Sequence, residues 1–408
     1  MALIVQKFGG SSVADADRVR NVAHIITETY RRGHSVVAVL SAQGDTTDDL
    51  IAKAKEINPN ASKREMDMLL STGEQISISL CAMAIERMGY QAISLTGWQA
   101  GMLTDSGYSN ARIKRIRTER IQKELDKKKI VLVAGFQGIN KYDDVTTLGR
   151  GGSDTSAVAL AAALRADLCQ IYTDVDGVYT ADPRTVKGAR KLEEITFDEM
   201  LELASLGAQV LHNRSVEMAK RYNVNMEVLS SFSGNPGTKV KEVIKTMEKT
   251  HVSGVAKDKN VARLALVGLA DQPGIAFKIF SLLAKKGINV DIILQSIGRN
   301  ESKDISFTVA RSDAEEAKRV LEENKEAIGF QTVELNDRIA KVSIVGAGMV
   351  NNAGVACKMF EALFSAGINI NMISSSEIKV SVLVDEREAD RAVQAIHDRF
   401  FSEFGSNA

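Results

Sequence analysis

The chain has 408 residues, too many for one ordinary hydrophobic core, so we expect two or three domains. Its 52 basic and 52 acidic residues cancel, which removes any global argument for binding nucleic acid or an anionic membrane. The three cysteines (Cys81, Cys169, Cys357) are far apart in apolar surroundings, unlike a disulfide framework or a metal-binding spacing. The apolar start is too short for a signal peptide, and no apolar run approaches the ~20 residues of a membrane helix. These features predict a soluble cytoplasmic protein with neither a membrane nor a nucleic-acid partner.

The first half of the chain alternates short apolar runs with segments of helical periodicity. Ala2–Phe8 and Ser35–Leu40 predict buried strands, and the segment from Asp15 onward predicts a helix between them. Similar strand-like runs recur at Ile130–Ala134 and Gln170–Tyr172. Near-continuous apolar strands that alternate with helices indicate an α/β fold, with a largely parallel sheet sandwiched by helices.

Polar residues follow four of these predicted strands, at Lys7–Ser12, Ser41–Thr47, Gly135–Gly138 and Thr173–Asp176. In parallel sheets ligands bind outside the carboxyl ends of the strands. We therefore expect these four segments to converge on one cleft.

The stretch Thr146–Leu164 places an arginine, glycines, a hydroxyl and an acid before an alanine-rich run. The run Ala157–Leu164 predicts a buried helix, with Ser153 and Asp154 as candidate N-caps. The start of such a helix suits an anion, and Arg150 offers a planar fork for a carboxylate or phosphate. A plain glycine-rich turn that caps a core helix explains this stretch equally well.

Other candidate residues also have simpler structural explanations. Lys7 before Gly9–Ser12 could hold phosphates, although the spacing is not that of a Walker loop and a solvated lysine is the alternative. Glu74 could bind an ammonium group or be a first-turn helix acid. The loop Thr173–Arg184 is rich in ligand-capable groups, whereas His212 fits a core or capping histidine.

Composition changes at Ser230–Thr250, where Ser, Gly and Pro precede a charged run, and we place a domain boundary there. Beyond it the sequence repeats with a period of 80 residues, from Gly274–Asn289 to Gly354–Asn369. A further strand follows in each copy, at Ile305–Val309 and Val380–Val384. The repeat predicts two copies of a small βαββ-type module.

Together these features resemble the aspartokinase family, over essentially the whole chain and in order. The stretches that carry the resemblance are KFGGSSV at Lys7–Val13, STGEQ at Ser71–Gln75, TLGRGGSDTSA at Thr147–Ala157, YTDVDGVYTADPR at Tyr172–Arg184, and the paired C-terminal modules. The resemblance implies an amino-acid-kinase catalytic domain at residues 1–240, then two ferredoxin-like ACT modules at residues 251–330 and 331–408. One departure is Asn213, where many members of the family have proline, and this substitution leaves any nucleotide contact from Asn213 open.

The implied reaction transfers the γ-phosphate of ATP, accompanied by Mg²⁺, to the β-carboxylate of L-aspartate. It is the first step toward lysine, methionine and threonine, with feedback inhibition by lysine, threonine or both through the ACT modules.

The implied catalytic residues are Lys7, Glu74, Arg150 and Asp154, with no metal held by protein side chains alone. The implied substrate residues are Ser41, Thr47, Glu74, Arg150, Gly151, Gly152 and Ser153. The implied ATP residues are Lys7, Phe8, Gly9, Gly10, Thr173, Asp174, Tyr179, Asp182, Pro183 and Arg184. The implied effector residues are Asp271, Gly274, Ile275, Ala276, Asn289 and Gln295 in the first copy, and Asn351, Asn369 and Ile370 in the second.

Several alternatives stay open from the sequence. Another amino-acid kinase of the same fold would use a similar sheet, and an amino-acid sensor with a degenerate kinase half would keep the repeats. The repeats could also serve only for dimerisation. The chain could form a homo-oligomer or assemble with a smaller ACT-only subunit made from an internal start, for which Met247 is suitably placed.

Overall fold

The computed structural model describes residues 1–206, 210–243, 252–296, 302–349, 352 and 354–402. The chain divides into two compact units. The first unit comprises Met1–Val178, Lys191–Ser205 and Gln209–Thr246, and the second comprises Tyr179–Arg190, Leu206–Ala208 and Met247–Ala408. The segment Tyr179–Arg190 therefore belongs to the second unit, although both of its flanks in sequence belong to the first.

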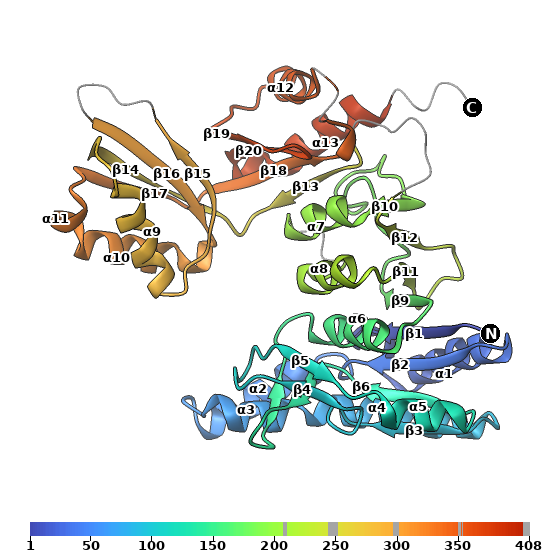
Figure 1. The fold of residues 1–408 in the computed structure, drawn as a ribbon. Coiled ribbons are helices and arrows are strands. Elements are labelled where there is room, and N and C mark those ends of the chain that lie inside the picture. The colour runs from blue at the N-terminus through green and yellow to red at the C-terminus, as the bar shows by residue number, and fades with distance from the viewer. Residues whose placement is uncertain (207–209, 244–251, 297–301, 350–351, 353, 403–408) are drawn as a thin grey trace. The chain divides into compact units, whose positions relative to one another are not determined.

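An eight-stranded sheet organises the first unit, and it confirms the predicted α/β class (Figure 1). In spatial order its strands are β10 (Glu194–Thr196), β12 (Thr238–Lys241), β11 (Met226–Ser230), β9 (Leu168–Thr173), β1 (Leu3–Phe8), β2 (Ser35–Leu40), β6 (Ile130–Ala134) and β3 (Ala92–Leu95). All neighbouring pairs are parallel except β11 with β12. The central strand β2 is buried along nearly all its length because helices cover both faces of the sheet.

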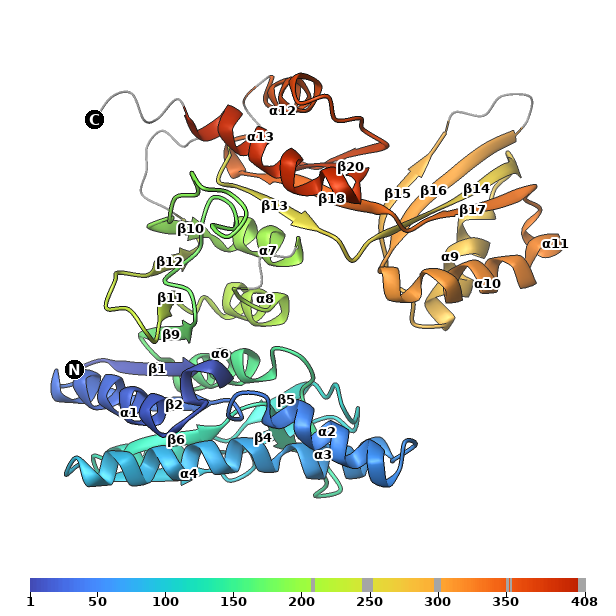
Figure 2. The same cartoon turned by 180° about the vertical axis from the view of Figure 1, so that it is seen from behind.

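Helices pack on both faces of this sheet. The helices of the first unit are α1 (Ala16–Arg31), α2 (Thr46–Ile57), α3 (Lys63–Leu70), α4 (Thr72–Arg87), α5 (Glu119–Asp126), α6 (Gly152–Leu164), α7 (Phe197–Ser205) and α8 (Asn213–Tyr222), with a 3₁₀ turn at Gly10–Val13. Side chains of α1 and α4 share one core with the sheet, whereas α6 lies across β1 and β9 on the other side, with α8 beyond it (Figures 1 and 2).

A second, smaller sheet of the first unit lies next to the loop that follows β8. Its order is β5 (Ile113–Ile116), β4 (Met102–Thr104), β7 (Gln137–Ile139) and β8 (Val145–Thr147). This sheet was not predicted, because three of its strands have only three residues.

One helical run, Lys63–Arg87 across α3 and α4, is long and apolar enough to cross a membrane by length and composition. No apolar run of that length was predicted from the sequence. Half of its most apolar window is buried, and Ile78, Cys81 and Ile85 belong to the core shared with the sheet. A core helix passes the same test.

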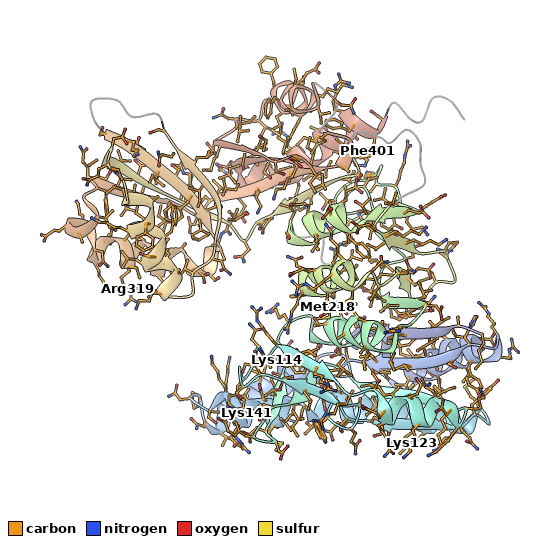
Figure 3. The ribbon with its side chains drawn as sticks, in the orientation of Figure 1. Lys114, Lys123, Lys141, Met218, Arg319 and Phe401 are labelled. Carbon is orange, nitrogen blue, oxygen red and sulfur yellow. The ribbon has the colours of Figure 1, made fainter. Side chains whose placement is uncertain are left out.

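Two four-stranded sheets form the second unit, and each sheet carries helices. The first comprises β15 (Val290–Gln295), β16 (Ser302–Val309), β14 (Ala262–Ala270) and β17 (Thr332–Asn336), with α9 (Ile275–Lys285), α10 (Ala314–Glu323) and α11 (Lys325–Ile328). The second comprises β13 (Gly254–Asp258), β18 (Ile339–Val345), β20 (Lys379–Asp385) and β19 (Met372–Ser375), with α12 (Val355–Ser365) and α13 (Ala389–Phe401). Phe401, labelled in Figure 3, ends α13 and stacks on His397 at 4.6 Å. The predicted repeat is confirmed, since β14–α9–β15–β16 and β18–α12–β19–β20 follow the same order.

Strand pairing departs from the predicted division at residues 251–330 and 331–408. Strand β13 lies within residues 251–330, yet it pairs with β18 of the second sheet. Strand β17 follows residue 330, yet it pairs with β14 of the first sheet. The first module is thus inserted in sequence within the second, because partner choice between strands is decided by contacts distant in the chain.

Candidate active site

Four strand ends meet at one edge of the large sheet, and they are the four that the sequence singled out. Strands β9, β1, β2 and β6 are consecutive neighbours in the sheet, and all run parallel. Backbone hydrogen bonds join the segments that follow them. The Gly9 N–H donates to Tyr172 O (3.3 Å), and the Gly44 N–H donates to Gly10 O (3.0 Å). The Gly135 N–H donates to Leu40 O (3.0 Å). The strand order and these bonds bring the predicted segments side by side.

A nearly buried ion pair lies at this edge. The Lys7 ammonium, at the end of β1, is 2.7 Å from the carboxylate of Asp154 in the first turn of α6. Both side chains are almost completely covered, with exposed fractions of 11% and 12%. A single opposite charge close to a lysine in such a place fixes the position of its ammonium. The pair therefore holds a cation at the sheet edge, beside the positive end of α6.

Close backbone approach explains the glycine that follows Lys7. A Cβ at Gly10 would lie 2.8 Å from the carbonyl oxygen of Ala42, so the β1 and β2 exits could not pack this closely with any larger residue. Phe8, which comes just before the glycines, is fully buried and stacks on Tyr172 of β9 at 4.7 Å. The end of β1 that carries Lys7, together with Gly9 after it, is therefore anchored to the strands on both sides of β1.

The loop with Arg150 joins β8 to α6, and two of its glycines have left-handed backbones. Gly149 and Gly151 have φ of +76° and +66°. A Cβ at Gly151 would lie 2.2 Å from the His212 ring, so only glycine fits there. Arg150 is exposed and forms no hydrogen bond or ion pair with any residue that the structure describes. Its guanidinium is available for a ligand.

The predicted capping of α6 is wrong. The helix begins at Gly152 rather than at Ala157, and its N-cap is Gly151, without a side-chain hydrogen bond. Ser153 and Asp154 lie inside the first turn, where they cannot act as N-caps. Asp154 is used for the ion pair with Lys7, and Ser153 packs against Gly135, where a Cβ would lie 2.7 Å from its hydroxyl oxygen.

Glu74 is a buried carboxyl group with one unused oxygen. It lies in the first turn of α4 and is 3% exposed. One oxygen accepts a long hydrogen bond (3.3 Å) from the N–H of Ala42, and the other has no partner among the described residues. Burial raises the pKa of Glu74 to about 8. A buried carboxyl group without a cation, next to the β2 exit, is a strong candidate for binding a ligand's ammonium group.

The other predicted substrate and nucleotide residues are divided between the two units. Ser41 and Thr47 are half-buried at the end of β2 and in the first turn of α2. In the first unit, the Thr173 hydroxyl donates to the carboxylate of Asp174 at 3.0 Å. Tyr179, Asp182, Pro183 and Arg184 belong to the second unit. There the Arg184 guanidinium bonds to the Asp182 carboxylate at 2.9 Å and holds the pKa of that carboxyl below its usual value.

His212 caps α8, as one of its two predicted roles requires. Its Nδ1 accepts from the Arg214 N–H at a long 3.4 Å. Asn213 is exposed, and its amide donates to the Ser205 hydroxyl at 2.9 Å.

Five of the six predicted effector residues of the first repeat lie toward one end of its sheet, whereas Asn289 lies at the opposite end, next to Val290, which pairs with Val309. Asp271 follows β14, Gly274 is the left-handed N-cap of α9, Ile275 and Ala276 open that helix, Asn289 precedes β15, and Gln295 ends β15. Ser302, which begins β16, pairs with the last residue of β14, so Asp271 and Gln295 lie at the same end of the sheet. The Asp271 carboxylate binds the Lys303 ammonium at 2.5 Å. In the second repeat Asn369 and Ile370 lie between α12 and β19, and Asn351 is outside the described residues.

Two charged residues beside the loop of residues 148–151, which carries Arg150 and is called the arginine loop below, were absent from the predicted site. Asp67 on α3 is fully buried, and Arg214 on α8 binds two backbone carbonyl oxygens. A depression of about 700 Å³ lies elsewhere on the first unit, where Met68, Leu69 and Trp98 line it. None of the predicted site residues lines that depression.

Comparison with known proteins gives a consistent family assignment. Residues 2–230 match the amino acid kinase family, and residues 264–324 and 342–400 each match an ACT domain. The aspartokinase of Bacillus sp. (strain MGA3) is 53% identical over 400 residues, which are 98% of this chain and 97% of that protein. E. coli aspartokinase III in complex with aspartate and ADP (R-state) has a TM-score of 0.83 and 27% identity, covering 98% of this chain and 100% of that one. The complex of E. coli aspartokinase III with lysine and aspartate (T-state) has a TM-score of 0.76 and 28% identity, covering 98% and 99%.

Proposed function

The chain belongs to the aspartokinase family, and on that premise we propose that it uses Lys7, Asp154, Arg150 and Glu74 to transfer the γ-phosphate of ATP to the β-carboxylate of L-aspartate. The product is 4-phospho-L-aspartate, the first intermediate toward lysine, methionine and threonine. The observation that carries the residue assignment is the covered Lys7–Asp154 pair, at the edge where four parallel strands end and beside the loop of Arg150.

The reaction needs no general base. A β-carboxylate with a pKa near 3.9 is already ionised at neutral pH, and its oxygen attacks the γ-phosphorus while the bond to the bridging oxygen of ADP breaks. The remaining difficulty is to hold two anions together and to stabilise charge on the phosphoryl group. Lys7 supplies the positive charge, and Asp154 keeps the ammonium in place. No nucleophile–histidine pair is required.

Two groups would recognise the charged ends of aspartate. Arg150 offers a bidentate fork to a carboxylate. Glu74 offers its carboxylate to the ammonium group, and that pairing would satisfy the oxygen that lacks a partner. An amino acid with both groups fits these two residues, whereas a nucleoside monophosphate has no ammonium group for Glu74.

ATP would enter with Mg²⁺. The residues that we assign to phosphate are Lys7, Phe8, Gly9 and Gly10, since the glycine backbone lies next to the lysine ammonium. Within the described residues no three His, Cys, Asp or Glu side chains gather into a metal site. Such a residue set fits a metal ion that is bound largely by the phosphates and water.

The direct test is a hydroxamate assay on the purified full chain. Hydroxylamine traps the acyl phosphate, so the expected result is hydroxamate that requires aspartate, ATP and Mg²⁺ together. Aspartate binding without ATP consumption, under every magnesium and effector condition, would contradict the proposed function.

Glu74 predicts a pH dependence of aspartate binding. Below about pH 8 its carboxyl group is mainly protonated, and a neutral group attracts the ammonium of aspartate poorly. We therefore expect the aspartate KM to fall about 10-fold per pH unit between pH 6 and 8 and to level off above pH 8. Initial rates measured against aspartate at saturating ATP will show this. In Glu74→Gln the KM should be high and nearly flat; a slope like that of the parent would exclude Glu74 as the titrating group.

We also propose that lysine, threonine or both inhibit the chain through its ACT modules. The support is the pair of ACT matches, together with the similarity to E. coli aspartokinase III, whose T-state complex contains lysine. Whether the chain assembles as a homo-oligomer or with a smaller ACT-only subunit is part of the same proposal. Met247, the suggested internal start, is outside the described residues.

Gln295 is the residue through which we test this regulation. It is exposed at the end of β15, and its counterpart in the second copy is Ser375 at the end of β19. Because one lost hydrogen bond costs about 1 kcal/mol, Gln295→Ala should raise the inhibitory effector concentration about 5- to 10-fold and leave uninhibited turnover unchanged. Ser375→Ala is the matched control. Inhibition curves for lysine, threonine and their mixture measure this shift in effector concentration. An unshifted curve would remove Gln295 from the effector site.

A further inference from the structure

We propose that Asp67 and Arg214 are positioning residues for aspartate binding, because together they fix the backbone from which Arg150 projects. The inference rests on the proposed function, in which Arg150 binds a carboxylate of aspartate. Neither residue needs to touch the substrate for this role. Both lie in the first unit, on helices α3 and α8.

Asp67 is a fully buried carboxylate that is surrounded by hydrogen-bond donors. It accepts from the Thr147 N–H (2.9 Å) and hydroxyl (2.8 Å), and from the Ser109 N–H (2.8 Å) and hydroxyl (3.3 Å). It forms no ion pair with any part of the chain that the structure describes. Its negative charge is therefore balanced by two backbone N–H groups and two hydroxyls, and all four belong to just two residues.

Arg214 makes the complementary contacts to the same two segments. Its Nη1 donates to the Leu148 carbonyl oxygen at 2.9 Å, and its Nη2 donates to the Ala111 carbonyl oxygen at 2.8 Å. The anion thus binds N–H groups at Ser109 and Thr147, and the cation binds carbonyl groups one or two residues further along each segment. The Ala111 N–H also donates a hydrogen bond to Thr147 O (2.8 Å), which joins the two segments directly.

The two clamped segments set the path of the arginine loop. Thr147 and Leu148 directly precede Gly149 and Arg150. A Cβ at Gly149 would lie 3.1 Å from Ser109 O, and Ser109 itself has a left-handed φ of +67°, which is uncommon for serine. The contacts of Asp67 hold Ser109 in this conformation. The turn at Ser109 then packs directly against the glycine that precedes Arg150.

The Arg150 side chain has no interaction of its own to orient it among the described residues, so its position depends on the backbone beneath it. Loosening that backbone would spread the guanidinium over more positions and weaken the carboxylate contact. The phosphate side would be spared, because Lys7 lies on β1 and its partner Asp154 is held in α6. The two substrates should therefore respond differently to loss of either residue.

The test is a kinetic comparison of Asp67→Asn and Arg214→Gln in the full chain. Asparagine keeps the shape of aspartate, but its NH₂ group would face N–H and hydroxyl donors. We expect the aspartate KM to rise about 10- to 100-fold, with the ATP KM and kcat each within about threefold of the parent. Arg214→Lys, which keeps one carbonyl contact, should give an intermediate aspartate KM.

A double-mutant cycle separates positioning from general damage. If Asp67 acts through Arg150, then Asp67→Asn in an Arg150→Ala background should raise the aspartate KM no further. Equal rises in both KM values, or full effects that multiply in the double mutant, would overturn the inference. If Asp67→Asn does not fold, Thr147→Val removes only one hydroxyl contact, and it must shift the aspartate KM selectively or the inference fails.

Glu124→Gln is the matched control. Glu124 is also a buried carboxylate of the first unit (3% exposed), but it binds Lys127 and Lys129 around α5. This variant can lower thermal stability but should leave both KM values unchanged. Failure of the proposed function gives a different result, because the unmodified chain would then form no hydroxamate from aspartate and ATP.

Discussion

Replacing Lys7 with alanine is expected to lower kcat about 1000-fold, the largest effect of any single change considered. The ammonium of Lys7 is the one nearly buried cation that the structure places at the strand ends within the described residues, where the phosphoryl group would transfer. Charge on the phosphoryl group is redistributed in the transition state, and removal of one preorganised group that stabilises it typically costs 100- to 1000-fold in rate. The loss also leaves Asp154 as an uncompensated negative charge beside incoming phosphates, which adds to the penalty. The fall in kcat is measured as steady-state turnover at saturating aspartate and ATP.

Two further variants serve as comparisons for Lys7→Ala. Lys241→Ala removes a lysine from β12 of the same sheet, where it pairs with Glu194, and it should keep near-normal turnover. Asp154→Asn should cost less than Lys7→Ala, because the ammonium stays but is less well held. Near-normal turnover of a folded Lys7→Ala protein would refute the phosphate assignment.

The sequence predicted the central sheet well because its strands are continuous apolar runs. Strands β2 and β6 have the bounds that were predicted, since short β-branched apolar runs such as SVVAVL and IVLVA between polar loops are typical of strands buried on both faces. The smaller sheet of the first unit, β5-β4-β7-β8, was not predicted. Its strands are three or four residues long, and β5, with the sequence IKRI, has no apolar face. Likewise, β13 pairs with the sheet of the second module and β17 with that of the first. Such pairing between distant segments is not encoded in local periodicity.

The local geometry of the candidate site was predicted in part, for similar reasons, whereas the roles of its residues stay predictions. Motif spacing pointed to Lys7 and Arg150, but the capping pattern misplaced the start of α6, because a left-handed glycine caps that helix and Asp154 is engaged by a lysine far away in sequence. The sequence offered little indication that Asp67 is buried, since an acidic residue in an amphipathic helix usually lies at the surface. The one hint was its apolar surroundings, with Met66 before it and Met68 to Leu70 after it.

Replacing Arg150 with alanine should raise the aspartate KM about 100- to 1000-fold and leave the ATP KM within about threefold. A bidentate guanidinium–carboxylate pair has two charge-assisted hydrogen bonds, each worth about 1.5–3 kcal/mol. Lysine keeps the charge but not the fork, so Arg150→Lys should recover only part of the loss. Arg221→Ala, which removes an exposed arginine paired with Glu217 on α8, is the control and should leave both constants unchanged.

A change in the substrate tests which carboxylate of aspartate Arg150 binds under the proposed assignment. The β-carboxylate must approach the phosphorus as a nucleophile, so a rigid clamp is better placed on the α-carboxylate. L-Isoasparagine has an amide at the α-position and keeps the β-carboxylate. If Arg150 binds the α-carboxylate, Arg150→Ala should penalise aspartate strongly and isoasparagine only slightly, because the parent enzyme has already lost that contact with the amide. An equal penalty for both substrates would place Arg150 on the β-carboxylate instead, and an unchanged aspartate KM would remove it from the site.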